Sequence, residues 1–396
     1  MSRLNSATPR KALIVTALAG FIRSFLMPDI ATLQSMDFEV HCAANANHAG
    51  ANDVVEFLES RGVIYHQVDF SSNKPVSKDT LTAFGQLKKL AASESFDFVH
   101  CHTPIAGALC RTVFRKCRKE GQTKVAYTTH GFYFHNRASR KAWACFYPVE
   151  DLMSRWSDVM ITINREDYGN ALKMHCDDVR YIPGVGVDID KFHGVQIKRD
   201  VYRASLNLKP DDFVILAVGE ISARKNQRII VEALARKPIS HAVFVVCGNY
   251  INGADTKESV EELARQNGVD VRFLGRRPDI PEICKCSDVG VLPSTREGLG
   301  LAGIEMLASG LPLIGSDVHG IPDYLIDGYN GVLCDPWSID TWADALQHLY
   351  SDYAYRAKLG SAGYESVKSF SLEESKACMV RIYSDLLSSN GAVSCA

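Results

Sequence analysis

Short apolar runs alternate with amphipathic stretches along the first half of the chain. The stretches between most of these runs space their apolar residues as a helix does, for example in 53–62 and 81–93. Strands that alternate with helices in this way favour a parallel sheet with helices on both faces. The runs that predict buried strands are residues 11–17, 39–44, 96–102, 124–130 and 158–164.

The same alternation begins again after residues 181–192, a segment rich in Gly and Pro that predicts a linker. The fold class that this indicates is α/β, with two doubly wound Rossmann-like domains in tandem. We expect these domains to occupy residues 1–184 and 185–370, followed by an amphipathic helix within 371–396. The expected strands of the second series are residues 212–220, 241–248, 271–275, 288–294, 311–317 and 331–335, with helices such as 227–235 and 341–351.

Composition narrows the choice of partners and compartment. The chain has 396 residues and a formal net charge of −2, so its size argues for two domains and its charge gives no field that would attract nucleic acid. Its 12 cysteines are scattered without a repeated CxxC, which favours free thiols in a reducing cytoplasm over a zinc site or disulfides. Residues 12–20 could form a short secretory signal, but the alternation that continues after them favours a first buried strand.

Two glutamates interrupt the apolar, glycine-rich segment REGLGLAGIEMLASGLPLIGSD, residues 296–317. Glu297 falls on the loop after an expected strand, and Glu305 falls inside the helix that follows. In open α/β sheets ligands bind beyond the carboxyl ends of the strands, and two facing domains would place this loop at a cleft. Gly298 and Gly300 allow the backbone to approach a ligand, a helix start favours phosphate, and carboxylates accept hydrogen bonds from hydroxyl groups. The combination indicates a nucleotide sugar, whereas the alternative is a surface loop with one solvated glutamate and one helix glutamate.

EGLGLAGIE, residues 297–305, resembles the E-x7-E signature of retaining glycosyltransferases of family 4, which have the GT-B fold. Residues 218–234 resemble the family's phosphate-binding segment, and residues 274–317 resemble its donor site. FDFVHCHTPIAG, YTTHGFYF and YIPGVGVDIDKF resemble the branch that builds capsular polysaccharides and exopolysaccharides. The resemblance implies a retaining transferase with two Rossmann-like domains facing across a cleft, and a last helix that packs back on the N-terminal, acceptor-side domain.

The resemblance also assigns roles in the second domain. Glu297 would hold the hydroxyl groups of the donor sugar and help to stabilise the charge that develops on it, and Glu305 would bind the ribose hydroxyls. Arg224 and Lys225 would neutralise the leaving diphosphate, and Arg277 would line the base pocket. The backbone that would approach the sugar and the phosphate comprises Gly298, Leu299, Gly300 and Leu301.

Two positions depart from the family pattern. Many members carry an arginine right after the glycine of the VG segment, and this chain has Glu220 there, so the diphosphate clamp rests on Arg224 and Lys225. Many members also carry a double-glycine loop after the first strand. Here Gly20 stands alone and is expected still to admit the donor phosphate closely.

Histidines end two of the expected strands of the first domain. A lone histidine such as His130 is more often a core or capping residue, but the family places a histidine of this kind at the donor sugar. His130 is therefore a catalytic candidate together with Glu297. His100 and His102 could be metal ligands, but no partner set is visible in the sequence, so we interpret them as structural.

No metal and no cofactor besides the nucleotide-sugar co-substrate is expected. Asp188 and Asp190 form a D-x-D element, but it lies in the expected linker and not after a donor-site strand. In GT-B enzymes, which the chain resembles, basic side chains and a helix end usually meet the charge of the phosphates.

Basic and aromatic residues gather between positions 111 and 156. Such a mixture suits an anionic membrane surface or a lipid-diphosphate acceptor, whereas the plainer interpretation is a solvated helix face over core aromatics. The basic residues are Arg111, Arg115, Lys116, Arg118, Lys119, Lys124, Arg137, Arg140 and Lys141. The aromatic residues are Phe132, Tyr133, Phe134, Trp143, Phe146, Tyr147 and Trp156.

Together these features predict a hexosyl- or N-acetylhexosaminyl-transferase of capsule or exopolysaccharide synthesis. It would move a sugar from a nucleoside diphosphate, UDP above all, to a lipid-diphosphate-linked saccharide. It would be cytoplasmic, peripheral on the inner face of the plasma membrane, and without a nucleic-acid partner. Three alternatives share the architecture or part of it: a UDP-sugar 2-epimerase, a nucleotide-sugar-binding protein without transferase activity, and an exported sugar-binding protein with two α/β lobes.

Overall fold

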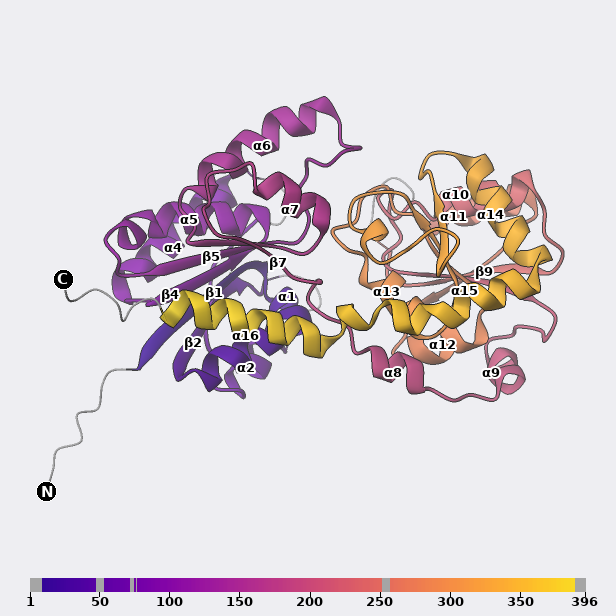
Figure 1. The fold of residues 1–396 in the computed structure, drawn as a ribbon, viewed down its shortest axis with the longest axis horizontal. Coiled ribbons are helices and arrows are strands. Elements are labelled where there is room, and N and C mark those ends of the chain that lie inside the picture. Colours follow the sequence, from indigo (N-terminus) through magenta and orange to yellow (C-terminus); the bar gives the residue numbers. More distant parts are fainter. Residues whose placement is uncertain (1–8, 48–52, 72–74, 76, 251–256, 389–396) are drawn as a thin grey trace, which may run out of the picture. The chain divides into compact units, whose positions relative to one another are not determined.

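The computed structural model of the chain describes residues 9–47, 53–71, 75, 77–250 and 257–388. The chain divides into two compact units (Figure 1). The first unit comprises residues 1–185 and 375–396, and the second comprises residues 186–374. The last helix, α16 (Leu372–Ser388), therefore begins in the second unit and continues in the first.

The first unit is built on a seven-stranded sheet with the order β3-β2-β1-β4-β5-β6-β7, and all neighbouring strands are parallel. The order reverses between β1 and β4, which places the topological switch point at the carboxyl ends of these two strands. The strands are β1 (Arg10–Leu18), β2 (Phe38–Asn45), β3 (Ile64–Gln67), β4 (Phe98–His102), β5 (Lys124–Thr129), β6 (Val159–Thr162) and β7 (Val179–Tyr181).

Helices cover both faces of this sheet (Figure 1). Side chains of β4 alternate between the two faces, as the pleat requires. Val99 and Cys101 belong to the core that α4 and α5 cover, and Phe98 and His100 contact Tyr383 of α16. The helical segments are α1 (Ala19–Phe21), a π-helical turn (Ile22–Leu26), α2 (Met27–Ser35), α3 (Val54–Glu59), α4 (Lys78–Ser93), α5 (Pro104–Lys119), α6 (Arg140–Ser154) and α7 (Arg165–Ala171).

The second unit has a six-stranded parallel sheet with the order β10-β9-β8-β11-β12-β13. Its switch point lies between β8 and β11. The strands are β8 (Phe213–Val218), β9 (Ala242–Cys247), β10 (Asp270–Gly275), β11 (Val289–Leu292), β12 (Leu313–Ser316) and β13 (Gly331–Cys334). The helices are α8 (Ile189–Gly194), α9 (Arg199–Ser205), α10 (Arg228–Arg236), α11 (Lys257–Asn267), α12 (Ile280–Cys286), α13 (Leu301–Ala308), α14 (Ile339–Ser351) and α15 (Tyr353–Ser366).

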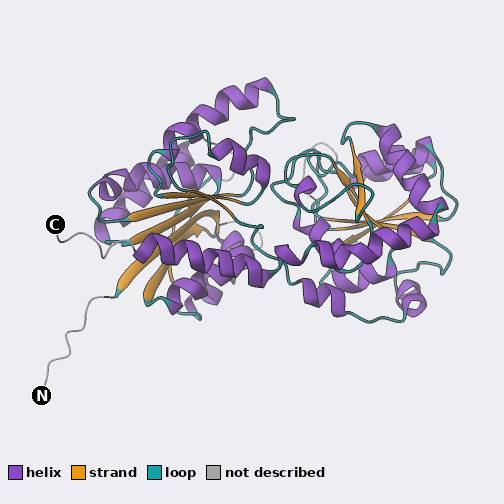
Figure 2. Cartoon of the chain, viewed as in Figure 1, coloured by secondary structure: helices purple, strands orange, loops and turns teal. Residues whose placement is uncertain are grey.

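Two parallel sheets, each enclosed by helices, confirm the predicted α/β class with two Rossmann-like domains (Figure 2). The edge strands β3 and β7 were not predicted. β3 carries polar residues and is only partly buried, and β7 has three residues, so neither gives the apolar run of a central strand.

The segment 181–192 is only in part a linker. The side chain of Asp188 accepts a hydrogen bond from the backbone N–H of Lys191 at 3.1 Å and so caps α8, which begins at Ile189. Asp190 accepts from the hydroxyl group of Tyr364 at 2.7 Å. Both aspartates of the D-x-D element therefore have structural partners within the second unit.

Candidate functional site

The loop between β11 and α13 lies at the carboxyl edge of the second sheet, beside the switch point. Gly300 is the N-cap of α13 and has a left-handed backbone, with φ at 82°. A Cβ atom there would lie 2.9 Å from Leu292 Cδ2. The left-handed backbone therefore favours glycine, and the space for a Cβ atom is tight. The loop enters α13 through Gly298, Leu299, Gly300 and Leu301, where the first N–H groups of a helix favour an anion.

Glu297 is 7% exposed, and one of its carboxylate oxygens accepts hydrogen bonds from three side chains. Its Oε1 atom accepts from Lys225 Nζ at 2.5 Å, from Arg224 Nη1 at 3.2 Å and from Ser294 Oγ at 2.8 Å. Burial opposes the charged carboxylate, but the charges of Lys225 and Arg224 outweigh it and lower the pKa of Glu297. The acidic and basic residues that the sequence singled out therefore meet in one ionised cluster.

Glu220, the position that departs from the family pattern, belongs to the same cluster. Its Oε1 atom accepts from Arg224 Nη2 at 2.9 Å and from Ser222 Oγ at 3.2 Å. Burial opposes the charge of Arg224, but Glu297 and Glu220 together raise the pKa of its guanidinium. Arg224 is thus held between two carboxylates, one on each side of the switch point.

Glu305 and Arg277 belong to the same unit. Glu305 is partly exposed on α13, and burial raises the pKa of its carboxyl group while Lys191 and Lys225 oppose the shift. Arg277 follows β10 and donates from Nε and Nη2 to the two carboxylate oxygens of Asp279, at 2.8 and 2.5 Å. This bidentate bond to Asp279 raises the pKa of Arg277. The pairing with Asp279 was not predicted, although the two residues are only two positions apart.

In the first unit, the predicted residues gather at the carboxyl edge of the sheet as well. Gly20 lies in α1, directly after β1. His130 follows β5 and is partly exposed, and Phe21 packs edge-on against it with ring centroids 4.8 Å apart. His130 Nε2 lies 3.1 Å from His102 Nδ1. Burial lowers the pKa of His130 to about 4, so its imidazole is neutral at physiological pH.

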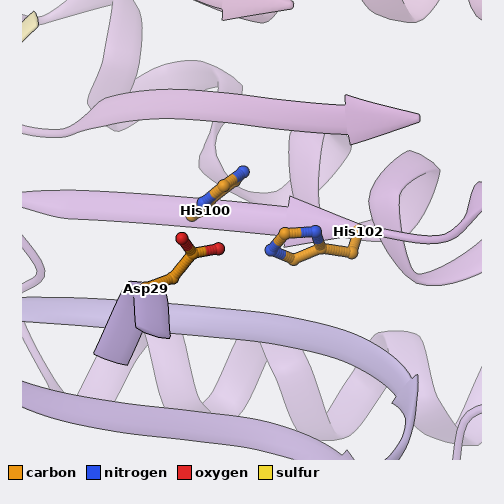
Figure 3. A group of neighbouring side chains, drawn as sticks. All are labelled: Asp29, His100 and His102. Atoms are coloured by element: carbon orange, nitrogen blue, oxygen red, sulfur yellow. The ribbon is translucent and has the colours of Figure 1, made fainter. Parts of the chain in front are cut away.

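His102 also lies near a residue that sequence reasoning missed. Figure 3 shows the ring of His102 and the carboxylate of Asp29 pointing toward one another. Asp29, on α2, places a carboxylate oxygen within 4.8 Å of a ring nitrogen of His100 and of one of His102. The sequence feature that could have identified Asp29 is its acidic side chain beside the apolar residues of the helix MPDIATLQS.

The basic and aromatic region divides between core and surface. Arg111 is fully buried and donates to Glu150 Oε2 at 2.7 Å, and Phe132 and Phe134 are buried in the core. Their burial excludes these three residues from a surface group, because residue type alone does not show which side chains the fold covers. The two phenylalanines agree with the plainer interpretation of core aromatics. The large apolar side chains that are exposed in this region are Tyr133, Phe146, Val149 and Leu152, all more than a third exposed.

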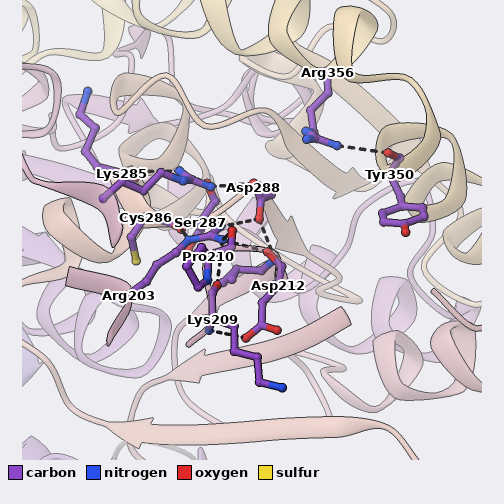
Figure 4. A network of polar contacts seen from close by, with 12 residues as sticks. Arg203, Lys209, Pro210, Asp212, Lys285, Cys286, Ser287, Asp288, Tyr350 and Arg356 are labelled. Atoms are coloured by element: carbon purple, nitrogen blue, oxygen red, sulfur yellow. Dashed lines mark hydrogen bonds and ion pairs between the residues drawn. The ribbon is translucent and has the colours of Figure 1, made fainter. Parts of the chain in front are cut away.

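A hollow of about 780 Å³ in the second unit lies away from these residues. Phe213, Asp288 and Pro312 line it, and they stand at or just before the starts of β8, β11 and β12. It therefore lies at the amino edge of the sheet, opposite the edge where α/β proteins bind ligands. Arg203 and its partners beside it form the polar network drawn in Figure 4.

The sequence and the fold were compared with known proteins. A family model described as Glycosyl transferases group 1 matches residues 198–366, and one described as Glycosyltransferase Family 4 matches residues 30–191. EpsD of Bacillus subtilis (strain 168), which bears the name of a glycosyltransferase, is 32% identical over 382 residues, or 95% of this chain and 96% of its own. The UDP-Gal:alpha-D-GlcNAc-diphosphoundecaprenol alpha-1,3-galactosyltransferase of Escherichia coli is 31% identical over 67% of this chain and 69% of its own.

Solved structures share the fold at low sequence identity. Anabaena Alr3699/HepE in complex with UDP and glucose aligns with a TM-score of 0.75 at 18% identity, over 96% of this chain and 100% of its own. Sucrose-phosphate synthase from Thermosynechococcus elongatus aligns with a TM-score of 0.78 at 21% identity, again over 96% and 100%. Within the described part of the chain, no helix combines the length and the apolar character that crossing a membrane requires.

Proposed function

Because the chain belongs to glycosyltransferase family 4 and has the GT-B fold, we propose that it is a retaining glycosyltransferase of capsule or exopolysaccharide synthesis. Its donor would be a UDP-sugar, and its acceptor a lipid-linked or growing saccharide. Relatives support both choices: the Escherichia coli relative is named for UDP-Gal and a diphosphoundecaprenol acceptor, and HepE was solved with UDP.

The observation that carries the proposal is the cluster around Glu297. Lys225 and Arg224 lie in the loop after β8, and Glu297 lies in the loop after β11. The two loops that flank the switch point therefore contact each other through these charged side chains. A diphosphate beside α13 would take over Lys225 and Arg224 as counter-charges. Glu297 would then accept hydrogen bonds from sugar hydroxyls and stabilise the positive charge that develops as the glycosidic bond breaks.

In the proposed front-face mechanism, the leaving diphosphate accepts the proton of the attacking hydroxyl group, and no covalent enzyme intermediate is required. Glu305 would bind the ribose and Arg277 the region of the base. His130 would contact the donor sugar from the first unit. The negative charge of the diphosphate would be met by Arg224, Lys225 and the start of α13, so we propose that transfer needs no metal ion.

Purified protein should be given UDP-, GDP-, ADP- and dTDP-sugars with a membrane lipid extract, and release of nucleoside diphosphate measured with and without EDTA. We expect release from a UDP-sugar that the extract stimulates and EDTA leaves unchanged. The linkage of the product, read by NMR, should keep the anomeric configuration of the donor.

Two variants make the result specific. Glu297→Ala should reduce release at least about tenfold, within the range for loss of a group that stabilises transition-state charge. Glu261→Ala, on the exposed face of α11, should match the wild type. If folded protein released nucleoside diphosphate from none of the donors, the transferase proposal would be overturned. Conversion of a UDP-sugar to its epimer without acceptor would show that the protein is an epimerase instead.

A further inference from the structure

His102 has a buried ring nitrogen without a hydrogen-bond partner. The residue is 1% exposed, and its Nε2 atom is buried with no bonding partner among the described residues. Its other nitrogen, Nδ1, lies 3.1 Å from His130 Nε2. A buried polar atom left unpaired is costly, so the surroundings of Nε2 should contain the group that satisfies it.

A small cavity of about 10 Å³ is lined by His102. Its polar lining comes from Asp29, His102, Thr128, His130, Ser375 and Lys376, all residues of the first unit. That volume is close to the least that holds one water molecule. A water there would have the Asp29 carboxylate on one side and His102 Nε2 on the other, as their orientation in Figure 3 suggests.

A metal ion fits these residues less well. Both ring nitrogens of His100 already have partners, since Nδ1 lies 2.8 Å from Tyr383 Oη and Nε2 lies 2.8 Å from Thr128 Oγ1. Only Asp29 and His102 could then offer a ligand atom without breaking a hydrogen bond. Two ligands fall short of the three that catalytic zinc sites take from the protein.

The proton between His102 and His130 can take two positions. Burial lowers the pKa of His102 well below its usual value and that of His130 to about 4, so both rings are neutral and each carries one proton. One ring must donate across the 3.1 Å contact and the other must accept. Whatever fixes the tautomer of His102 therefore fixes which nitrogen of His130 keeps a lone pair.

We propose that Asp29, acting through one buried water, is a positioning residue that holds His102 as the Nε2–H tautomer. His102 Nδ1 then accepts from His130 Nε2–H, and His130 offers Nδ1 as a hydrogen-bond acceptor. Given the role proposed above for His130, on which this last step rests, that acceptor would receive a hydroxyl hydrogen of the bound sugar. The chain Asp29, water, His102 and His130 sets the direction of every hydrogen bond up to the substrate.

The state of the Asp29 carboxyl group decides the direction of this chain. Burial raises its pKa to about 7. Above that pH the ionised carboxylate only accepts, and below it the acid can donate and reverse the chain. The titratable groups packed around it are His100 and His102 on β4, His130 after β5, and Lys376 and Tyr383 on α16.

NMR of protein labelled with ¹⁵N in histidine tests the proposal without any assay of activity. Long-range ¹H–¹⁵N correlation shows which ring nitrogen carries the proton, and a His130→Gln sample assigns the His130 signals. At pH 8 we expect His130 as the Nε2–H tautomer in the wild type and in Asp29→Glu. Asp29→Asn should give a mixture or the Nδ1–H tautomer, and Asp177→Asn, an exposed change in the same unit, should match the wild type.

Three results would overturn the proposal: His130 as Nδ1–H in the wild type, an unchanged tautomer in Asp29→Asn, or stoichiometric Zn²⁺ that shifts His100 and His102 together. Circular dichroism and thermal unfolding would first establish that each variant is folded. Once a donor is known, Asp29→Asn should lower kcat about tenfold, the order expected for the loss of one hydrogen bond, and leave the donor KM within about twofold. Because the tautomer is read directly, a failed transferase assay would not decide this test.

Discussion

At the scale of single residues, the buried charge of Glu297 is stable because Lys225 and Arg224 neutralise it. Lys225 has little contact with water, and its side chain is 13% exposed. In the protein without substrate, Glu297 therefore forms ion pairs with the two cations that would bind a diphosphate in the proposed mechanism. In the proposed mechanism, substrate binding would exchange one anion for another at the same two cations.

This exchange predicts opposite effects on binding and transfer. Glu297→Gln keeps the shape of the side chain but removes its charge, so Lys225 and Arg224 should attract a diphosphate at least as strongly as before. We expect an unchanged or lower Kd for UDP by calorimetry, together with a kcat at least about tenfold lower. Weaker UDP binding in folded Glu297→Gln would show that Glu297 contacts the nucleotide, contrary to its proposed place at the sugar.

Glu305 allows a prediction about stability as well as binding. Its pKa is raised by burial, so the folded protein favours the protonated acid and bears a cost when the carboxyl group ionises. That cost is present at pH values above the folded pKa and disappears as the pH falls below the unfolded pKa. Glu305→Gln should therefore unfold at a higher temperature than the wild type at pH 7.5, with the difference shrinking toward pH 4.

The same variant should bind UDP about tenfold more weakly, since it loses the carboxylate that we propose as the acceptor for the ribose hydroxyls. Such a trade of stability for function is common at binding sites. If Glu305→Gln were less stable than the wild type at pH 7.5, or bound UDP normally, the carboxylate would have a structural role instead.

At the scale of elements, α13 depends on a close approach between Gly303 and Tyr324. The hydroxyl group of Tyr324 donates to the carbonyl oxygen of Gly300 at 3.0 Å and so fixes the start of the helix. A Cβ atom on Gly303 would lie 2.2 Å from that hydroxyl oxygen. The loop that carries Glu297 is thus positioned by packing behind it.

Gly303→Ala should therefore cost about 1–3 kcal/mol of stability by overpacking and weaken UDP binding as well. Gly85→Ala is the matched control, because it is also a helical glycine but has open space around its Cβ position, and it should be neutral or stabilising. Tyr324→Phe, which removes the clashing hydroxyl group, should restore part of the loss in the double variant. Urea unfolding of the four proteins gives the coupling, and strictly additive effects would contradict this contact.

Helix α6 is the element that we propose for contact with a membrane surface. Phe146, Val149 and Leu152 recur at helical spacing and are 37–47% exposed, and Tyr133 stacks on Phe146. Arg140 and Lys141 are exposed at the start of the helix. Apolar side chains beside cations suit insertion into an anionic interface.

Sedimentation with phosphatidylglycerol vesicles tests this prediction. Phe146→Ser/Val149→Ser should reduce the bound fraction severalfold, and added salt should weaken wild-type binding. Leu81→Ser, which changes a 74% exposed leucine on α4, should bind as the wild type does. Equal binding of all three proteins would remove α6 as the contact surface.

At the scale of the whole molecule, each unit has its own core and its own buried polar network. In the second unit, Arg203 donates to the carbonyl oxygens of Cys286, Pro210 and Asp212 and to a carboxylate oxygen of Asp288 (Figure 4). One guanidinium thus ties α9 to the segments that lead into β8 and β11. A substitution that breaks this network should therefore destabilise the second unit and leave the stability of the first unit unchanged.

Arg203→Met should lower the free energy of unfolding of the second unit by about 3 kcal/mol, because buried acceptors lose their donor. Arg236→Met removes an exposed ion pair with Asp340 and should change the free energy of unfolding by about 0.5 kcal/mol or less. Hydrogen exchange resolved by peptide should show the loss of protection in residues 186–374 and unchanged protection in the first unit. Equal losses in both units would show that the two cores unfold together.

The sequence by itself determined the fold class and the placement of the loops, because strand and helix periodicities are local and repeat in a fixed order. It also determined which loop carries Glu297, since the loop follows an apolar run and precedes a helix. The sequence did not determine which side chains contact one another. Glu297 meets Lys225 across 72 residues, and Asp29 reaches His102 from another element, because both contacts depend on strand order. Only the tertiary structure decided these pairs and the burial of Arg111, since spacing along a chain does not specify which helix covers which face.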